Sequence, residues 1–333
     1  MVVTFYLSDL HACGHVRGEI LAREVNKNHP NDMIICKSDM LASDFFKSHV
    51  MVFQRQHSTI ALHKMLAAQE RGIKCIYECD DDPFHTPEDF IEPFKFYNQP
   101  KVQLNIKAFM QCADAITVST DALADETAKH TQKPIFVVDN SLDIEMWEPQ
   151  KRKAEGTTIG WMASGSHTID APLVVDAIFE VMSERPETKL HLIGWVGWEQ
   201  LGDRFKKFGD RVKFEPWVDI YDLPYVMSDI DIGLCPLVDN QFNRCKSNVK
   251  WLQYSGIGAA TIASDLEPYK AITNGVDGLQ VKDDEWHDAI LGLVDDLAGR
   301  ESLAKTALER VYSNYDIQKN ARLWMEVFTK VRN

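Results

Sequence analysis

Long apolar runs and long basic runs are both missing from this sequence of 333 residues. No apolar run approaches the roughly 20 residues that a membrane-spanning helix needs, and the N-terminus has no basic region of the kind that precedes a secretory signal. The formal net charge is −14, and the main basic cluster is the short one at residues 151–153. General binding to polyanions is therefore disfavoured, and an anionic ligand would need a local positive pocket. These absences predict a soluble, cytoplasmic protein.

Cysteine pairs are also missing. The seven cysteines are scattered and odd in number, which is typical of free thiols in a reducing compartment. Cys75 and Cys79 have no second pair and no histidine cluster beside them in the sequence, so a zinc site of that type is not expected. The sequence after the first apolar segment, LSDLHACGHVRG, lacks Gly-x-Gly-x-x-Gly, which disfavours a dinucleotide-dependent oxidoreductase.

Short apolar segments alternate with amphipathic ones along the whole chain. Strands are expected at residues 2–7, 33–36, 50–53, 73–78, 115–118, 135–138, 157–161, 189–193, 212–214, 230–235, 259–263 and 279–281. Helices are expected between most of them, and a final amphipathic helix covers about residues 317–331. This alternation predicts an α/β protein with parallel sheets covered by helices on both faces.

The length favours two domains over one. Periodicity is lost over residues 140–155, which contain the basic triplet at 151–153, and we interpret this segment as a linker. We expect one doubly wound domain at residues 1–150 and a second at residues 151–315, with the helix at 316–333 returning to the first. In such sheets, ligands bind beyond the carboxyl ends of the strands.

The segment FNRCKSNVKWLQYSGIGAATIASD, residues 242–265, predicts a loop, a helix, a glycine turn and a buried strand. Lys246, Lys250 and Gln253 have the spacing of one helical face. Arg244, Lys246 and Ser247 would surround the N-terminus of this helix, where an anion such as a phosphate is stabilised.

These residues resemble a family. Residues 242–279 resemble the signature of glycosyltransferases with two facing Rossmann-like domains (the GT-B fold), most of all family 4. GIKCIYECDDDPF, ADAITVSTDALAD, VVDNSLDIEMW and IGWMASGSHTIDAPLVVDAI resemble further elements of that family, in the same order along the chain. The resemblance covers nearly the whole sequence.

The resemblance implies a sugar donor in the second domain and an acceptor in the first. The donor would be a nucleotide-diphosphate sugar of the UDP or GDP type, used as a co-substrate without any cofactor or metal and with retention of configuration. Lys246 would stabilise the leaving diphosphate, because fixed positive charge lowers the barrier where negative charge develops. The donor-side residues would be Ser164, Gly165, Ser166, His167, Arg244, Ser247, Lys250 and Gln253. The sequence departs from the family at Cys245 and Gln253, where the family carries two glutamates.

Asp80, Asp81 and Asp82 have several interpretations. Asp-x-Asp binds manganese in the other large glycosyltransferase fold, and carboxylates suit hard cations. The two-domain pattern instead favours orientation or deprotonation of an acceptor hydroxyl by Asp80 or Asp81, and a capping turn without chemistry remains an alternative. On the acceptor side we expect Gly14, His15, Arg17, Arg55 and His57.

The leading functional hypothesis is therefore glycosyl transfer from a nucleotide-diphosphate sugar to a hydroxyl acceptor. The alternatives are an epimerase or hydrolase of nucleotide sugars on the same fold, transfer to modified nucleic acid bases in a phage setting, and a binding protein without catalysis. The sequence leaves the acceptor open among polysaccharide, glycolipid, protein and modified nucleic acid.

Overall fold

The computed structural model describes residues 1–9, 12–148, 156–194 and 198–333. The chain forms two compact units: unit 1 contains Met1–Asp143, Arg244–Ser247 and Tyr315–Asn333, and unit 2 contains Ile144–Asn243 and Asn248–Asn314. The basic triplet at residues 151–153, which belongs to the predicted linker at residues 140–155, lies outside the described residues. Among the described residues, no helix combines the length and the apolar composition that crossing a membrane requires.

Unit 1 contains a parallel sheet of six strands in the order β2-β1-β3-β4-β5-β6. The strands are β1 (Val2–Tyr6), β2 (Met33–Lys37), β3 (Val50–Gln54), β4 (Lys74–Cys79), β5 (Ala115–Val118) and β6 (Ile135–Val137). The helices are α1 (Ala12–Gly14), η1 (His15–Glu19), α2 (Ile20–Asn28), η2 (Ala42–Phe46), α3 (Thr59–Gln69), α4 (Ile91–Tyr97), α5 (Pro100–Cys112), α6 (Asp121–Ala128) and α14 (Ile317–Arg332). Strands β3 and β4 are fully buried or nearly so, which explains their almost continuous apolar sequences.

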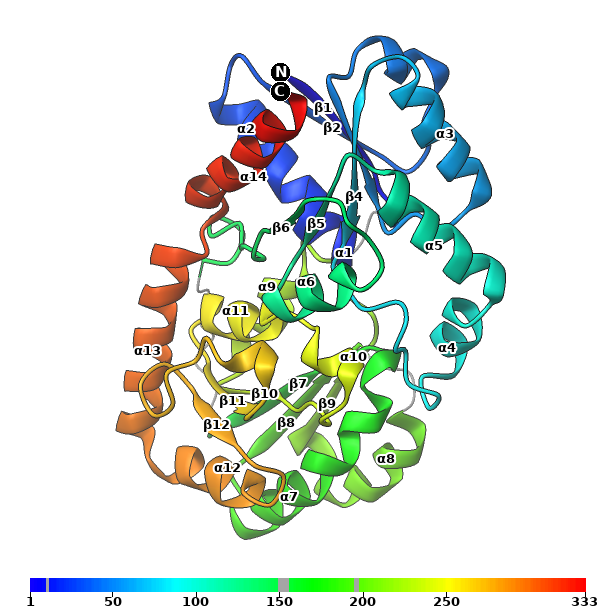
Figure 1. Ribbon diagram of the computed structural model, residues 1–333. Helices are drawn as coiled ribbons and strands as arrows, with labels where there is room; N and C mark the ends of the chain where they lie inside the picture. Colours follow the sequence, from blue (N-terminus) through cyan, green and yellow to red (C-terminus); the bar gives the residue numbers. More distant parts are fainter. Residues whose placement is uncertain (10–11, 149–155, 195–197) are drawn as a thin grey trace. The chain divides into compact units, whose positions relative to one another are not determined.

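Two apolar clusters hold helices against the unit 1 sheet. One cluster joins α3 and α5 to β3 and β4 through side chains such as Met65 and Phe109. The other joins α2 and α14 to β1, with Phe5 lying 5.9 Å from Trp324 between ring centroids. The last helix of the chain, drawn in red, therefore lies beside α2, drawn in blue (Figure 1).

Unit 2 contains a second parallel sheet of six strands in the order β12-β11-β10-β7-β8-β9. The strands are β7 (Thr158–Met162), β8 (Lys189–Ile193), β9 (Val212–Glu215), β10 (Ile232–Cys235), β11 (Ala260–Ser264) and β12 (Leu279–Val281). The helices are η3 (Gly165–Asp170), α7 (Ala171–Glu184), α8 (Trp198–Phe205), η4 (Lys206–Arg211), α9 (Leu223–Val226), η5 (Met227–Asp229), α10 (Gln241–Arg244), α11 (Val249–Gly256), η6 (Glu267–Tyr269), α12 (Trp286–Asp295) and α13 (Leu297–Asn314). This strand order is the Rossmann order, so the predicted fold class is confirmed.

Side-chain caps fix where several of these helices begin. The Ser58 hydroxyl accepts a hydrogen bond from the backbone of Ala61 at the start of α3, and Thr120 does the same for Leu123 at the start of α6. The Asp316 carboxylate accepts from the backbone of Gln318 and starts α14. Each cap satisfies an amide group that the helix itself leaves without a partner.

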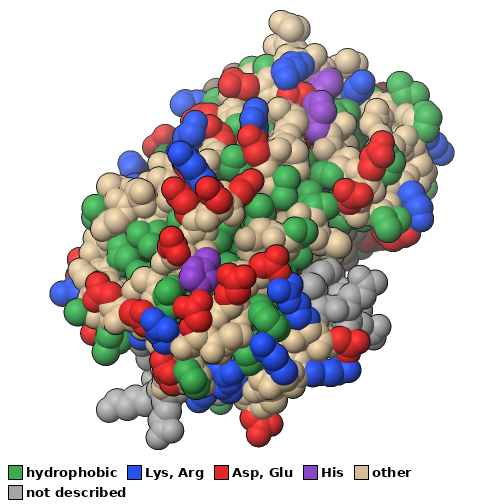
Figure 2. Space-filling model, turned by 90° about the horizontal axis from the view of Figure 1, so that it is seen from below, with side chains coloured by type: hydrophobic (Ala, Val, Ile, Leu, Met, Phe, Trp, Pro, Cys, Tyr) green, Lys and Arg blue, Asp and Glu red, His purple; other side chains and the backbone are tan. Residues whose placement is uncertain are grey.

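The surface carries both signs of charge. On the face drawn in Figure 2, Lys and Arg side chains are interspersed with Asp and Glu side chains. On this face, positive charge therefore comes from individual residues that are interspersed with acidic ones.

Candidate functional site

Each sheet reverses its strand order at one place, and the residues after the strands at that place are the first candidates for ligand binding. In unit 1 the reversal lies between β1 and β3, so the segments after Tyr6 and Gln54 meet at the same edge. In unit 2 it lies between β7 and β10, so the segments after Met162 and Cys235 meet. Most of the predicted site residues follow one of these strands or β4, the neighbour of β3.

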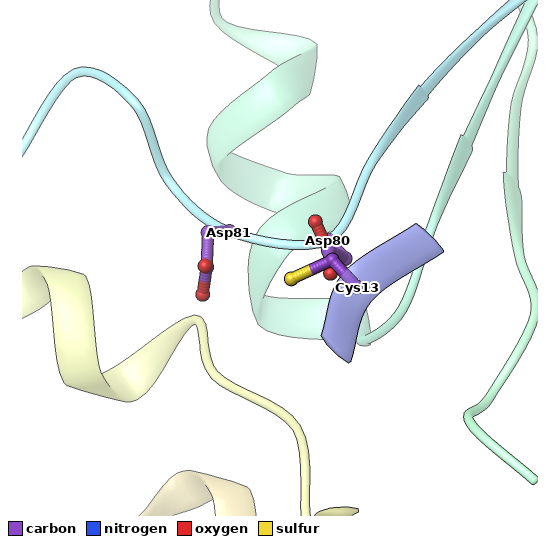
Figure 3. Close-up of side chains that lie close together, drawn as sticks. All are labelled: Cys13, Asp80 and Asp81. Atoms are coloured by element: carbon purple, nitrogen blue, oxygen red, sulfur yellow. The ribbon is translucent and has the colours of Figure 1, made fainter. Parts of the chain in front are cut away.

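At the edge of unit 1, Arg55 joins side chains from four segments, and we call this group the Arg55 cluster (Cys13, Arg55, Asp80, Asp81 and Tyr97). Arg55 Nη1 lies 2.9 Å from Cys13 Sγ, 3.2 Å from Asp80 Oδ1 and 3.3 Å from Asp81 Oδ2. Arg55 Nη2 donates to the Tyr97 hydroxyl at 3.0 Å. Figure 3 shows Cys13 on α1 beside the two aspartates of the loop that follows β4. The structure thus brings three predicted residues, Arg55, Asp80 and Asp81, together.

The Arg55 guanidinium provides the positive charge of this cluster. Cys13, Asp80 and Asp81 are close enough to one another for a metal ion, but Arg55 donates to all three. Burial raises the pKa of the Cys13 thiol well above its usual range, and Asp80 raises it further; a protonated thiol is a poor metal ligand. The Arg55 guanidinium therefore lies where it can compensate the negative charge of the two carboxylates.

The backbone of Arg55 is strained. Its φ angle is 51°, and in the described part of the chain it is the only residue other than glycine with a positive φ. This conformation carries a cost for a residue with a Cβ, and such costs concentrate at functional sites. The strained residue, Arg55, is also the residue whose side chain joins four segments at the edge of the sheet.

The segment Arg244–Ser247 belongs to unit 1 and leads directly to this cluster. Lys246 Nζ lies 4.0 Å from Asp81 Oδ1. The Thr120 hydroxyl donates to the backbone oxygen of Cys245 at 3.0 Å, and Asn140 Nδ2 donates to Ser247 Oγ at 2.7 Å. These bonds to α6 and to the segment after β6 hold Lys246 beside the acidic loop.

One prediction about this segment is wrong. Helix α11 begins at Val249, with Asn248 as its flanking residue, so Lys246 precedes the helix and shares no helical face with Lys250 and Gln253. Arg244 is exposed at the end of α10. The i, i+4, i+7 spacing suggested a longer helix, but the side chains of unit 1 hold residues 245 and 247 in a loop instead.

The buried position of Cys245 gives a physical reason for the departure from the family pattern. Cys245 is fully buried in the α3–α5 cluster of unit 1, and its sulfur lies 4.0 Å from Asp82 Oδ2. A glutamate here would place a second carboxylate against a buried one, at a large cost in desolvation and repulsion. A small, weakly polar side chain suits this environment.

Three of the predicted acceptor-side residues lie inside unit 1. Gly14 is buried at the end of α1, where a Cβ would lie 2.0 Å from the backbone oxygen of Asp9. His15 is buried and its Nδ1 lies 3.3 Å from Glu19 Oε2. Arg17 is also buried and forms an ion pair with Glu78. These three residues support the edge of the sheet from within.

His57 lies closer to the surface. Its ring contacts Phe96 edge-on, with 4.7 Å between centroids, and its Nδ1 lies 3.3 Å from the backbone oxygen of Arg55. Helix α4 supports both residues, because its Phe96 contacts His57 and its Tyr97 accepts a hydrogen bond from Arg55. The structure therefore groups His57 with the Arg55 cluster.

At the edge of unit 2, Asp170 joins the segments after β7 and β10, and we call this the His167 cluster (His167, Asp170 and Asn243). Asp170 Oδ2 lies 2.7 Å from His167 Nδ1, while Asp170 Oδ1 accepts from the backbone of Val238 at 2.8 Å and from Asn243 Nδ2 at 3.2 Å. All three side chains are buried. A buried carboxylate that accepts several hydrogen bonds fixes the position and orientation of the groups that donate to it.

The other predicted donor-side residues of unit 2 lie around the same edge. Lys250 Nζ donates to the backbone oxygen of Met162, the last residue of β7, at 2.7 Å. Ser164 and Gly165 come next along the chain, with Gly165 exposed, and η3 begins there. Gln253 is buried on α11, and the side chain of Ser166 lies outside the described part of the structure.

Sequence reasoning missed Tyr97, Asp170 and Asn243. Asp170 follows His167 by three residues, a spacing that allows a local hydrogen bond and could have drawn attention to it. Tyr97 and Asn243 reach their clusters through folding of distant segments, and no local pattern marks them.

Comparisons with known proteins agree with this architecture. Residues 176–326 match the family model described as glycosyl transferase-like. The putative teichuronic acid biosynthesis glycosyltransferase TuaH of Bacillus subtilis strain 168 is 21% identical over 285 residues, which cover 73% of this chain and 69% of that protein.

Solved structures resemble the whole chain. HepE from Anabaena, solved in complex with UDP-glucose, has a TM-score of 0.70 at 13% identity and covers 99% of this chain and 100% of its own. Sucrose-phosphate synthase from Thermosynechococcus elongatus has a TM-score of 0.71 at 11% identity and covers 99% and 98%. At such identities the structural likeness shows the fold. The family match and the structural likeness together show that the chain is similar to group 1 glycosyltransferases with two Rossmann-like domains. Its class of enzymatic activity is glycosyl transfer.

Proposed function

We propose that the protein transfers a sugar from a UDP-sugar to a hydroxyl group of a growing polysaccharide. The observation that carries the proposal is the position of Lys246 beside Asp81, at the unit 1 edge that also holds Arg55 and Asp80. HepE, which has the same fold, was solved with UDP-glucose, and the name of TuaH refers to synthesis of a polysaccharide, teichuronic acid.

The charges of the unit 1 edge suit both halves of the reaction. As the bond between the sugar and the diphosphate breaks, negative charge grows on the leaving UDP, and Lys246 stabilises it. The acceptor oxygen forms the new glycosidic bond, and its proton passes to the Asp81 carboxylate. Arg55 and Tyr97 keep Asp81 and Asp80 in position for this transfer.

The edge of unit 2 supplies the donor site. Main-chain groups from residue 164 to 167 lie beyond β7, at the switch point where nucleotides bind in sheets of this order. Asp170 ties this segment to the backbone of Val238 and to Asn243. We propose that Ser164, Gly165 and His167 contact the UDP-sugar, with Asp170 as a positioning residue.

We further propose that transfer retains the anomeric configuration and needs no catalytic metal. Lys246 and Arg244 offer positive charge to the diphosphate, which is the task that a divalent cation performs in metal-dependent transferases. Product configuration, read by NMR spectroscopy of the glycoside, tests retention. Metal independence is tested by measuring the transfer rate with and without added Mg²⁺ or Mn²⁺, and we expect equal rates.

The decisive experiment incubates the full chain with UDP-sugars, with and without saccharide acceptors, and measures UDP release and glycoside formation. We expect UDP release that depends on acceptor. The variant Asp170→Asn is expected to raise the KM for the UDP-sugar while leaving the KM for the acceptor unchanged, and Asp176→Asn, at an exposed position on α7, is the matched control.

Two outcomes contradict the proposal. Release of free sugar at the same rate without acceptor would indicate a hydrolase, and interconversion of the UDP-sugar without release of UDP would indicate an epimerase. An equal rise in both KM values for Asp170→Asn would argue against a donor site at the edge of unit 2.

A further inference from the structure

Two hydrogen bonds fix the residues on either side of Lys246. On one side, the Thr120 hydroxyl donates to the backbone oxygen of Cys245 at 3.0 Å. On the other side, Asn140 Nδ2 donates to Ser247 Oγ at 2.7 Å. Lys246 lies in a loop before α11, so anchors of this kind, and not the hydrogen bonds of a helix, determine where its ammonium group lies.

The orientation of the Asn140 amide is set from inside unit 1. Arg17 Nη1 donates to Asn140 Oδ1 at 2.9 Å, and an arginine side chain carries only donors. The amide oxygen therefore faces Arg17, and the amide nitrogen faces Ser247. Arg17 is itself buried and paired with the buried Glu78. Asn140 is thus held in one orientation by groups that are fixed themselves, which is how supporting residues keep a site in its productive geometry.

We propose that Asn140 and Ser247 are positioning residues for Lys246 in the transfer reaction. The family resemblance placed Ser247 among the residues that contact the donor, but its Oγ is the acceptor of the Asn140 amide. A displacement of about 1 Å can cost about 100-fold in rate, so a catalytic lysine in a loop depends on such a bond. This inference rests on the proposed function, which assigns Lys246 to the leaving UDP.

Ser247 is the best residue for the test. Thr120 also accepts a hydrogen bond from the backbone of Leu123 and caps α6, so its replacement would disturb that helix. Ser247 is half-buried, and Ser247→Ala removes the acceptor of the Asn140 amide while the bond between Arg17 and Asn140 stays. Ser247→Thr keeps a hydroxyl group at the same place.

The test measures kcat for UDP release from the full-length protein with saturating UDP-sugar and acceptor, together with a thermal melt. We expect Ser247→Ala to lower kcat roughly 10- to 100-fold with little change in Tm, and Ser247→Thr to restore it. Asn140→Ala breaks the same bond from the other side and should lower kcat at least as much. When Ser247→Ala is added to Lys246→Ala, kcat should not fall further, because the side chain that Ser247 positions is already gone.

Ser183→Ala is the matched control, because Ser183 is an exposed serine on α7 whose hydroxyl also accepts a hydrogen bond from a side-chain nitrogen. It should keep the wild-type kcat.

The possible failures of this inference and of the proposed function are distinguishable. If Lys246→Ala lowers kcat but Ser247→Ala or a folded Asn140→Ala protein keeps the wild-type value, the inference is overturned and the proposed function stands. If Ser247→Ala lowers kcat further in the Lys246→Ala protein, Ser247 acts on the substrate itself, and the inference is overturned as well. A wild-type kcat for Lys246→Ala would contradict both.

Discussion

The Arg17 guanidinium and the Glu78 carboxylate form an ion pair inside unit 1, with 2.8 Å between Arg17 Nε and Glu78 Oε1. Arg17 Nη1 also donates to the backbone oxygen of Val138 at 2.6 Å and to Asn140 Oδ1 at 2.9 Å. Arg17 thereby links β4 to the segment after β6, which in turn holds Ser247 through Asn140. The buried pair thus supports the loop that carries Lys246.

The stability of the protein should depend on pH through Glu78. Burial raises the pKa of Glu78 to about 7 despite the opposing effect of Arg17. Between pH 4.5 and about 7 the folded protein keeps a proton that the unfolded chain has released, so the free energy of unfolding falls as pH rises through this window. Urea titrations of the wild type and of Glu78→Gln at several pH values measure the free energy of unfolding. In the variant, this free energy should no longer fall between pH 4.5 and about 7 as a result of Glu78 ionisation.

Glu92→Gln is the control for the pH experiment, because Glu92 is an exposed glutamate on α4 of the same unit. Its pH dependence should match the wild type. If the free energy of unfolding depended on pH in the same way for the wild type and Glu78→Gln, Glu78 would have the same pKa in the folded and unfolded states.

Lys246→Ala should reduce transfer strongly without unfolding the protein. Loss of one group that stabilises charge in a transition state costs about 10²- to 10³-fold in kcat. The measurement is kcat for UDP release with saturating UDP-sugar and acceptor, alongside a thermal melt. Lys95→Ala, at an exposed lysine on α4, is the control and should keep wild-type kcat. A Lys246→Ala enzyme with wild-type kcat would remove Lys246 from the site.

Two substitutions of Arg55 separate its charge from its backbone conformation. Arg55→Ala and Arg55→Gly both remove the donor to Asp80 and Asp81, so both should lose acceptor-dependent transfer. At φ 51° alanine retains the strain that glycine relieves, so the glycine variant should be more stable by about 1 kcal/mol. Chemical denaturation measures the difference; equal stability, or greater stability of the alanine variant, would show that the backbone changes conformation once the guanidinium is removed.

Cys245→Glu should destabilise the protein even though it restores a residue of the family signature. The new carboxylate would lie in the α3–α5 cluster near Asp82, and burying an uncompensated charge costs about 3–5 kcal/mol. Cys245→Ser, which is similar in size, should fold and retain transfer. Chemical denaturation of both variants checks this, and a Cys245→Glu protein as stable as the wild type would mean that the loop at residues 244–247 moves away from Asp82.

The strands were predictable because their signal is local. Buried parallel strands such as β4 and β11 are short apolar runs bounded by polar residues, and each predicted strand overlaps a strand of the structure. The caps of α3 and α6 are local as well, because Ser58 and Thr120 each accept a hydrogen bond from an amide three residues later. The fold class therefore follows from patterns that extend over fewer than about ten residues.

The candidate site depends on contacts that no local pattern contains. Lys246 has helical spacing to Lys250, but bonds from Thr120 and Asn140, far away in the sequence, hold residues 245 and 247 in a loop. Arg17 was predicted beside a ligand because it follows the first strand and carries a charge. Its burial with Glu78 depends on β4, which is about sixty residues later in the sequence.

Helix α14 has a consequence for how the protein folds during synthesis. Phe5 of β1 is covered by Trp324 and Phe328 of α14, while unit 2 ends at Asn314. The ribosome therefore finishes all the residues of unit 2 before it makes the helix that covers the first strand. Domains usually fold in the order in which they are synthesised. Here the sheet that is made first is completed last, and until then a nascent chain leaves the apolar face of β1 uncovered, as a surface that chaperones could bind.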